Sequence, residues 1–294
     1  MKSKYPGKLL PLLFLAPTLI VSVLFLYYPA GMSFRLSLYK TLFMGRKKVF
    51  NGLGNFVDLF TSPKFHAVVG KSFIFSFSVV VGGLVIGLAI ALLANRKVRG
   101  ARLYRTGLIW PYALSPAIAG TIWLFLFNPN TGMLTYVIEV LFGVQPDWLA
   151  SGPLSMFMVI VAATWKNLGY NIIFFLAGLQ NVPGEFLEAA DVDGANVFQK
   201  FWHITLPLLS PTIFFLVVMN MIYSFFRTFA LIDIMTKGGP AGATNIMIFN
   251  LYRDAFQYFR SGIAASQSLL LFVLVSILTL IQFKTSGKGV YYGG

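Results

Sequence analysis

The chain has 294 residues, with 23 lysines and arginines against 9 aspartates and glutamates and a formal net charge of +14. Hydrophobic residues make up 57% of it and charged residues 11%, whereas a soluble domain has about 45–50% and about 25%. A water-soluble fold could not bury so much apolar surface, and the 30 phenylalanines exclude a disordered chain. The lack of cysteine excludes disulfides, Cys-ligated zinc and thiol catalysis. The composition predicts an all-α, polytopic membrane protein.

Apolar stretches long enough to cross a bilayer, which needs about 20 helical residues, recur along the chain. The first follows Lys2, Lys4 and Lys8 and ends in an aromatic pair, Tyr27–Tyr28. Because a signal peptide has a core of only about 7–15 residues, we expect an uncleaved anchor. The six predicted transmembrane helices are residues 9–28, 72–94, 106–127, 154–179, 208–234 and 263–283. The runs do not alternate in the way that a β-barrel requires.

A shorter apolar stretch, Leu134–Val144, carries Glu139 and is too short to cross. We expect an interfacial or re-entrant helix there. An even number of spans places both termini on one side of the membrane. With that side cytoplasmic, eleven basic residues lie inside against nine outside, and the inner set includes a tight group between Arg96 and Arg105. The positive-inside rule therefore favours cytoplasmic termini.

No motif for catalysis, metal binding or nucleic-acid binding is present. Gly70-Lys71-Ser72 resembles the end of a phosphate-binding loop, but the required earlier glycine is replaced by Phe65. The two histidines are far apart, and the basic residues are scattered singly between apolar runs. Gly83 and Gly87, four positions apart in the second span, would allow two helices to approach closely. We therefore expect a chain that is not an enzyme and that binds no cofactor.

Acidic residues concentrate in the predicted loop between the fourth and fifth spans, residues 180–207. Four of the nine lie there: Glu185, Glu188, Asp191 and Asp193. Pro183 is suited to open a helix and acidic residues suit its first turns, while Gly194 allows a turn that a side chain would resist. An aromatic second half then extends to Pro207. We expect two short helices at the membrane surface, of a kind that docks into a partner's groove.

This loop resembles a known family. Glu188-Ala189-Ala190, three residues, Gly194, nine residues and Ile204-x-Leu206-Pro207 match the E-A-A-x3-G-x9-I-x-L-P loop of ABC importer permeases. Thr236-Lys237-Gly238-Gly239-Pro240 and the ending from Gly262 to Gln282 look like the carbohydrate-uptake branch, and the resemblance covers nearly the whole chain. Four short strings look most like the A-type subunit of glycerol 3-phosphate permeases: residues 111–113, 126–129, 170–171 and 264–268.

The resemblance implies an assembly. Two homologous six-helix permease subunits form the pathway, two ATPase subunits carry ATP and Mg²⁺ on the cytoplasmic side, and a periplasmic or lipid-anchored binding protein delivers substrate. The loop 180–207 would be the cytoplasmic coupling-helix loop. Its ATPase-coupling residues would be Glu188, Ala189, Ala190, Asp193, Gly194, Ile204, Leu206 and Pro207. The chain would lie in the inner or plasma membrane of a prokaryote, surrounded by lipid, with both termini cytoplasmic.

Polar and charged residues within the spans are candidates for the substrate pathway, because a charge there costs about 2.5–3.5 kcal/mol on insertion scales. The candidates are Lys166, Asn167, Asn171, Arg227, Asp233 and Gln267. Lys166 and Arg227 would suit a phosphate, although Lys166 could instead pair locally, and Arg227 stands where glycerol phosphate permeases usually have an acid. We expect import of glycerol 3-phosphate or a related phosphorylated polyol. Alternatives are a neutral sugar or oligosaccharide, or a secondary transporter driven by an ion gradient.

Overall fold

The structure is a computed structural model that describes residues 9–42, 45–95 and 101–286. It divides into two compact units. The first unit comprises the chain up to Phe65 together with Leu251–Phe272, and the second comprises His66–Asn250 together with the chain from Val273 onward. Much of the basic group predicted to face the cytoplasm, including Arg96, Lys97 and Arg99, lies outside the described residues. So do both chain termini.

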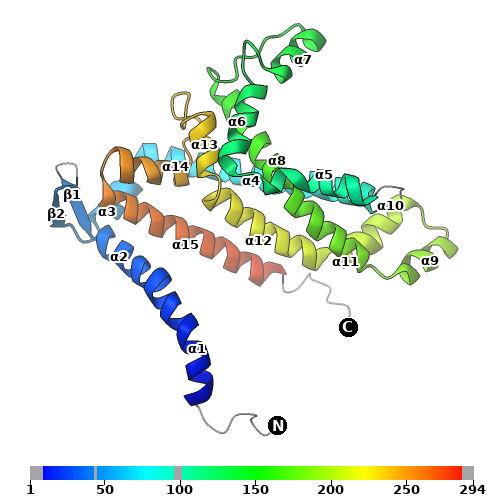
Figure 1. Cartoon of the computed structure of the whole chain (residues 1–294), viewed down its shortest axis with the longest axis horizontal. Helices are drawn as coiled ribbons and strands as arrows, with labels where there is room; N and C mark the ends of the chain where they lie inside the picture. The colour runs from blue at the N-terminus through cyan, green and yellow to red at the C-terminus, as the bar shows by residue number, and fades with distance from the viewer. Residues whose placement is uncertain (1–8, 43–44, 96–100, 287–294) are drawn as a thin grey trace. The chain divides into compact units, whose positions relative to one another are not determined.

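Helices dominate the fold, as the composition predicts (Figure 1). Four described helices are long and apolar enough to cross a membrane, and the number rises to six if each of two bent helix pairs is one span. The four are the run Leu12–Ser37, helix α4 (Pro63–Ala94), helix α8 (Gly152–Gln180) and the run Ser261–Thr285 within helix α15 (Ser261–Ser286). The predicted all-α membrane class is therefore confirmed.

The first span is longer than its apolar stretch indicates. Helix α1 (Leu9–Ser22), the π-helical segment η1 (Val23–Tyr27) and helix α2 (Tyr28–Ser37) follow one another without interruption. Pro29 has no N–H, and the preceding π turn, in which the Tyr28 N–H donates to the Val23 carbonyl, lets the helix pass that proline. The most apolar part of this run has none of its residues buried within the chain, which leaves its surface to lipid or to another subunit.

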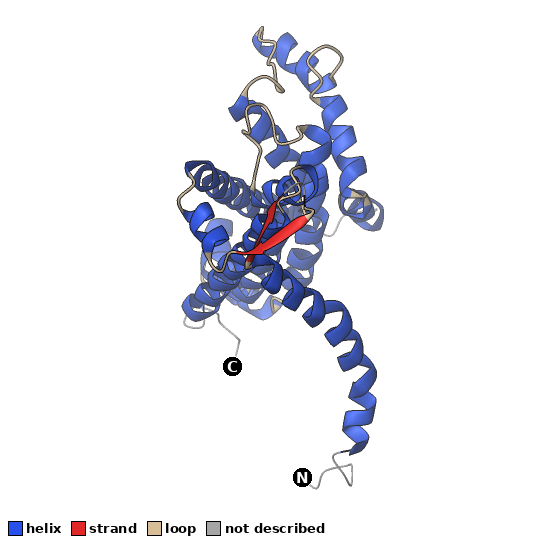
Figure 2. Ribbon diagram, turned by 90° about the vertical axis from the view of Figure 1, so that its left-hand side faces the viewer, coloured by secondary structure: helices blue, strands red, loops and turns tan. Residues whose placement is uncertain are grey.

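The first unit also contains a small antiparallel hairpin that was not expected. Strands β1 (Tyr39–Leu42) and β2 (Lys47–Phe50) pair in the register Tyr39 to Phe50, and Figure 2 shows them in red. The rings of these two residues meet edge to face at 5.5 Å. Helix α3 (Gly54–Phe60), the end of helix α14 (Met247–Tyr252), the π-helical segment η3 (Arg253–Gln257) and the first turns of α15 complete the described part of this unit.

In the second unit, α4 and α8 pack closely at the predicted glycine pair. A Cβ added at Gly83 would lie 2.8 Å from Asn171 Nδ2, and one added at Gly87 would lie 2.8 Å from Asn171 Cβ. Both distances are shorter than van der Waals contact, so a side chain at either position would force Asn171 or one of the helices to shift. The close approach that the Gly-x-x-x-Gly spacing indicates is confirmed, and it places α4 against the polar face of α8.

The third predicted span, residues 106–127, is broken in the middle. Helix α5 (Ala101–Ala113) and helix α6 (Pro116–Leu126) are bent from each other by 106°. Pro116 cannot continue α5, because it lacks an N–H and disfavours helical geometry at Ser115. Ser115 is accordingly extended, and its hydroxyl accepts a hydrogen bond from the Ile118 N–H at 3.2 Å to begin α6. Helix α7 (Met133–Phe142) then forms within the short apolar stretch.

The fifth predicted span, residues 208–234, is also divided. Helix α12 (Ser210–Phe226) ends at Arg227, and a separate helix α13 (Phe229–Met235) follows. Before α12, the loop after α8 contains helix α9 (Gly184–Val192) and then a helical run made of α10 (Val197–Lys200), η2 (Phe201–Thr205) and α11 (Leu206–Leu208). This run is bent by 66° from α12.

Candidate functional site: a polar cavity and a surface loop

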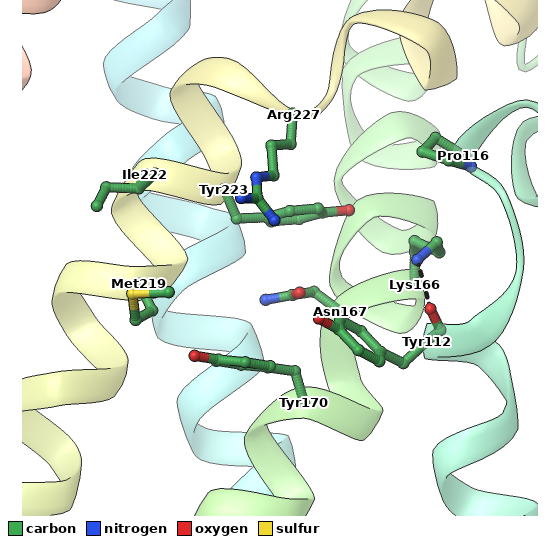
Figure 3. Close-up of a pocket in the computed structure, with 9 residues that line it drawn as sticks. All are labelled: Tyr112, Pro116, Lys166, Asn167, Tyr170, Met219, Ile222, Tyr223 and Arg227. Atoms are coloured by element: carbon green, nitrogen blue, oxygen red, sulfur yellow. Dashed lines mark hydrogen bonds between the residues drawn. The ribbon is translucent and has the colours of Figure 1, made fainter. Parts of the chain in front are cut away.

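A cavity of about 280 Å³ lies among the broken third span, α8 and α12, all within the second unit (Figure 3). Tyr112 and Pro116 line it from the α5–α6 break. Lys166, Asn167 and Tyr170 line it from α8, and Met219, Ile222, Tyr223 and Arg227 from α12 and its C-terminal end. The lining residues include two cations and no carboxylate. Three of the predicted pathway residues, Lys166, Asn167 and Arg227, therefore meet at one site.

Lys166 is held by a backbone carbonyl. Its side chain is buried, and its Nζ donates to the Tyr112 carbonyl oxygen at 2.9 Å and lies 5.0 Å from the centre of the Tyr112 ring. In an uninterrupted helix that carbonyl would accept the N–H four residues later, but the residue there is Pro116, which has none. The ammonium also lies at the C-terminal end of α5, where the helix dipole favours a cation. Lys166 thus supplies the hydrogen-bond donor that the Tyr112 carbonyl lacks at the break in the third span.

Arg227 has a different setting. It forms the C-terminal cap of α12, where its N–H donates to the Tyr223 carbonyl at 2.9 Å, and its side chain is exposed. In the described part of the chain no ion pair involves this guanidinium. Figure 3 shows its side chain beside Tyr223 at the cavity. Arg227 therefore carries an uncompensated positive charge, with its hydrogen-bond donors available to a ligand.

Asn167 and Asn171 belong to a buried amide cluster with Asn220 of α12. Asn220 Oδ1 accepts from Asn167 Nδ2 at 2.9 Å and from Asn171 Nδ2 at 3.2 Å, and Asn220 Nδ2 donates to Asn171 Oδ1 at 2.6 Å. All three side chains are buried. Asn171 thus faces α4 and α12, and is not among the residues that line the cavity. Asn220 was not among the predicted pathway residues, although it is an amide inside an apolar span, as Asn167 and Asn171 are, and carries the same signal.

The remaining two pathway candidates are not among the residues that line the cavity. Asp233 is on α13, partly exposed, and is not among the cavity-lining residues. Gln267 lies in the first unit, where its Nε2 donates to Asp254 Oδ2 at 2.5 Å, and both side chains are buried. Burial raises the pKa of Asp254, while the hydrogen bond from Gln267 and the charges of Arg260 and Arg253 oppose that rise. Gln267 is thus not among the residues that line the polar cavity, and its place in the substrate pathway stays a prediction.

The first half of the loop 180–207 is helix α9 (Gly184–Val192), which follows Pro183 and stops two residues before Gly194. Glu185 lies in its first turn, Glu188 and Ala189 are exposed, and Ala190 is buried. At its end the Ala195 N–H donates to the Ala190 carbonyl at 2.9 Å, and the Gly194 N–H to the Asp191 carbonyl at 3.1 Å. These two bonds form a Schellman motif, in which the residue after the C-cap must be left-handed. Gly194 has a φ of +77° and Asp193 is the C-cap.

The second half of the loop is the run α10–η2–α11. Asn196 and Gln199 form a reciprocal capping box at its start, and Lys200 Nζ lies 2.5 Å from Asp191 Oδ1, which joins the two halves. Ile204 and Leu206 are half-buried and Pro207 is exposed. Apolar side chains at the turn between the halves are strongly exposed: Val192 by 87%, Val197 by 76% and Phe198 by 77%. Such a concentration of exposed apolar side chains marks an interaction surface.

Comparison with known proteins gives relatives along the full chain. The chain is 41% identical over 289 residues, 98% of each chain, to the sn-glycerol-3-phosphate transport system permease protein UgpA of Agrobacterium fabrum. It is 40% identical over 288 residues to the permease of the same name from Escherichia coli strain UTI89, covering 98% of this chain and 97% of that one.

Solved structures show the same fold. A bacterial ABC transporter that imports the acidic polysaccharide alginate has a chain that matches with a TM-score of 0.81 at 24% identity, over 95% of this chain and 96% of that one. The alginate transporter in complex with an alginate pentasaccharide-bound periplasmic protein matches with a TM-score of 0.80 at 23% identity, over 95% and 94%. Residues 83–285 match the profile of a protein family described as the binding-protein-dependent transport system inner membrane component. The chain belongs to this family of ABC importer permeases, which are multi-pass transport subunits of the inner membrane and not enzymes.

Proposed function

We propose that this permease subunit imports sn-glycerol 3-phosphate or a closely related phosphorylated polyol, and that the substrate phosphate contacts Arg227 in the cavity. The observation that carries the proposal is the charge of that cavity, whose lining has two cations and no carboxylate. A phosphate monoester carries a charge of about −1.5 to −2 at neutral pH. The names of the relatives that match nearly the whole chain point to the same substrate.

The two cations have separate roles in this proposal. Lys166 is engaged by the Tyr112 carbonyl at 2.9 Å and contributes its charge without giving up that bond. Arg227 has no ion pair within the described chain, so its planar guanidinium can bind two phosphate oxygens at once. Asn167 and Tyr170 line the same cavity and suit the polyol hydroxyls. The volume of about 280 Å³ lies at the lower end of small-molecule sites, which favours a small substrate over an oligosaccharide.

The loop 180–207 is the proposed contact with the ATPase subunits. The exposed apolar residues Val192, Val197 and Phe198 supply the contact surface, and the Asp191–Lys200 ion pair makes the two halves move together. Glu188 and Gly194 are the residues proposed to couple ATP hydrolysis to the spans. Because the ATPase subunits act on the cytoplasmic side, we propose that the loop and both termini lie in the cytoplasm. ATP and Mg²⁺ then bind to two ATPase partners, a second permease subunit completes the pathway, and a binding protein delivers substrate from the opposite side.

Uptake by the assembled transporter tests the substrate. Arg227→Ala is expected to lower uptake of labelled sn-glycerol 3-phosphate roughly tenfold to hundredfold, because a charged hydrogen bond contributes about 1.5–3 kcal/mol. Arg227→Lys should recover part of the loss. Lys237→Ala removes a cation of the same unit that is not among the residues lining this cavity, and should have little effect. Uptake of a neutral polyol should fall much less than uptake of the phosphate.

Two outcomes would favour the other functions. If Arg227→Ala lowers uptake of phosphorylated and neutral substrates equally, Arg227 has a structural role. A neutral sugar would then be the favoured substrate. Uptake that persists without the ATPase subunits would indicate a secondary transporter driven by an ion gradient.

A further inference from the structure

A second cavity lies in the first unit, at the end of the first membrane span. It has a volume of about 320 Å³ and is lined by Met32, Ser33, Arg35 and Leu36 from the last turns of α2, Tyr39 of β1 and Lys48 of β2. The hairpin folds back so that Lys48, in β2, reaches the same space as Arg35, in α2. None of these residues belongs to the polar cavity of the second unit.

The lining combines two kinds of chemistry. Arg35 and Lys48 are cationic, Tyr39 and Ser33 carry hydroxyls, and Met32 and Leu36 are apolar. No acidic residue lines the cavity, and within the described chain neither cation takes part in an ion pair. A concave site that combines two cations and two hydroxyls with apolar side chains suits an amphipathic anion.

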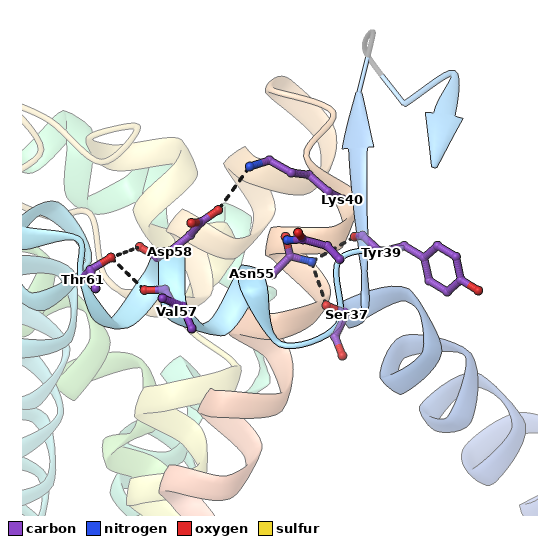
Figure 4. A network of polar contacts seen from close by, with 8 residues as sticks. Ser37, Tyr39, Lys40, Asn55, Val57, Asp58 and Thr61 are labelled. Atoms are coloured by element: carbon purple, nitrogen blue, oxygen red, sulfur yellow. Dashed lines mark hydrogen bonds and ion pairs between the residues drawn. The ribbon is translucent and has the colours of Figure 1, made fainter. Parts of the chain in front are cut away.

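The wall of the cavity is fixed in place by the junction between α2 and β1 (Figure 4). Asn55 Nδ2 donates to the Ser37 carbonyl at 2.7 Å and to the Tyr39 carbonyl at 3.0 Å, and the Ser266 hydroxyl also donates to the Ser37 carbonyl, at 3.2 Å. Gly262 lies so close that a Cβ there would be 1.9 Å from the Tyr39 carbonyl oxygen. The site is therefore largely formed before a ligand arrives, which lowers the entropic cost of binding.

The acidic residue of α3, Asp58, is already engaged by a lysine. Asp58 Oδ2 pairs with Lys40 Nζ at 3.4 Å, as Figure 4 shows. Lys40 lies next to Tyr39 in β1 but does not line the cavity. Asp58 thus has a cationic partner outside the cavity. The positive charge of the cavity is accordingly left for an external anion.

The surroundings of the cavity identify the source of that anion. The preceding helical run, Leu12–Ser37, is a candidate span whose most apolar part has no residue buried within the chain. The hairpin exposes Phe50 by 66% and Val49 by 42%, next to the exposed Lys47 and Lys48. Aromatic and basic side chains together at the end of a span are typical of the membrane–water interface. An amphipathic anion at this depth is a phospholipid.

We infer that this cavity binds the headgroup of an anionic phospholipid, with its phosphate between Arg35 and Lys48. The Tyr39 hydroxyl donates to the phosphate, and Met32 and Leu36 contact the start of an acyl chain. The bound lipid ties the hairpin to the outer end of the first span. This site is independent of the substrate proposed for the second unit.

The experiment measures lipid retained by the purified, assembled transporter, using native mass spectrometry with phosphatidylglycerol or phosphatidylcholine added in detergent. The wild type should retain phosphatidylglycerol in preference to phosphatidylcholine. Arg35→Gln combined with Lys48→Gln should lower that preference about thirtyfold, as expected for two basic residues near an anionic headgroup. Arg46→Gln combined with Lys47→Gln removes the same charge from the same hairpin outside the cavity, and should change it less than about twofold.

Three results would overturn the inference. The first is equal retention of the two lipids by the wild type, and the second is equal loss in the cavity variant and the matched control. The third is displacement of phosphatidylglycerol by free sn-glycerol 3-phosphate or inorganic phosphate, which would assign the site to a soluble anion. If the double variant fails to assemble, Lys48→Gln alone, on an exposed strand, should lower the preference about fivefold, and an unchanged preference would refute the site.

Discussion

Replacing Lys166 with methionine separates support of the fold from contact with substrate. Methionine has a similar length but no donor, so the Tyr112 carbonyl would lose the 2.9 Å bond that it receives from Nζ. Pro116 cannot replace that donor, because it has no N–H. Leaving a buried acceptor unsatisfied costs about 1–3 kcal/mol. Since each kcal/mol shifts the melting temperature of a chain of this size by about 2–4 °C, Lys166→Met should melt several degrees lower.

Two measurements are made on each variant. Thermal unfolding of the detergent-solubilised transporter is monitored by size-exclusion chromatography, and uptake is measured in membrane vesicles. Lys166→Arg keeps a donor at the α5–α6 break and should melt closer to the wild type. Lys64→Met, in the exposed first turn of α4, is the control for loss of a lysine and should melt unchanged. A Lys166→Met variant that melts as the wild type but transports nothing would refute the reasoning, because Lys166 would then act on the substrate.

Three further predictions concern other parts of the chain. Asn220→Leu removes the three hydrogen bonds that join Asn167 and Asn171 to Asn220 of α12. Each such bond contributes about 0.6 kcal/mol in a membrane, so the melting temperature should fall by several degrees. An unchanged melting temperature would show that water replaces the amide. Gly194→Val forces a side chain into the left-handed region at a cost of about 1–2 kcal/mol, although a Cβ there meets no neighbour within 4 Å. The subunit should therefore still insert into the membrane, but binding-protein-stimulated ATP hydrolysis should no longer drive uptake. Normal uptake would contradict the coupling role. Burial raises the pKa of Asp254 above its unfolded value. The stability that the protonated carboxyl contributes is therefore full below about pH 4 and is lost as pH rises through the folded pKa. In Asp254→Asn the melting temperature should no longer show this decline with pH, and an identical decline in both proteins would contradict the assignment.

Much of the helical framework follows from the sequence, because apolar length alone decides whether a stretch can cross a bilayer. The predicted fourth span, 154–179, lies within α8, and the predicted sixth, 263–283, lies within α15. The turn at Gly194 also follows, because glycine adopts a positive φ without strain. Its φ of +77° agrees with that expectation.

The breaks in the third and fifth spans could not be predicted from the sequence, because a broken and a continuous helix can have the same hydrophobicity. Pro116 stands inside a continuous apolar stretch, and proline is common in membrane helices when neighbours satisfy the freed carbonyl. Whether such a helix kinks slightly or turns by 106° depends on which donor is available. Here the donor is Lys166, on another helix and fifty-four positions away in sequence. The break and the buried lysine are therefore one feature, visible only in three dimensions.

The contrast between the two cations of the cavity links the fold to the proposed transport. Both carry the cost of a charge within a membrane-spanning region, yet Lys166 recovers part of it through the Tyr112 carbonyl while Arg227 has no ion pair within the described chain. A charge that the fold leaves without an ion pair at the cavity is available to an anion that enters it. An anionic substrate would stabilise that charge only while it occupies the pathway. On this reasoning Arg227 should bind the phosphate transiently and Lys166 should keep the cavity open to receive it.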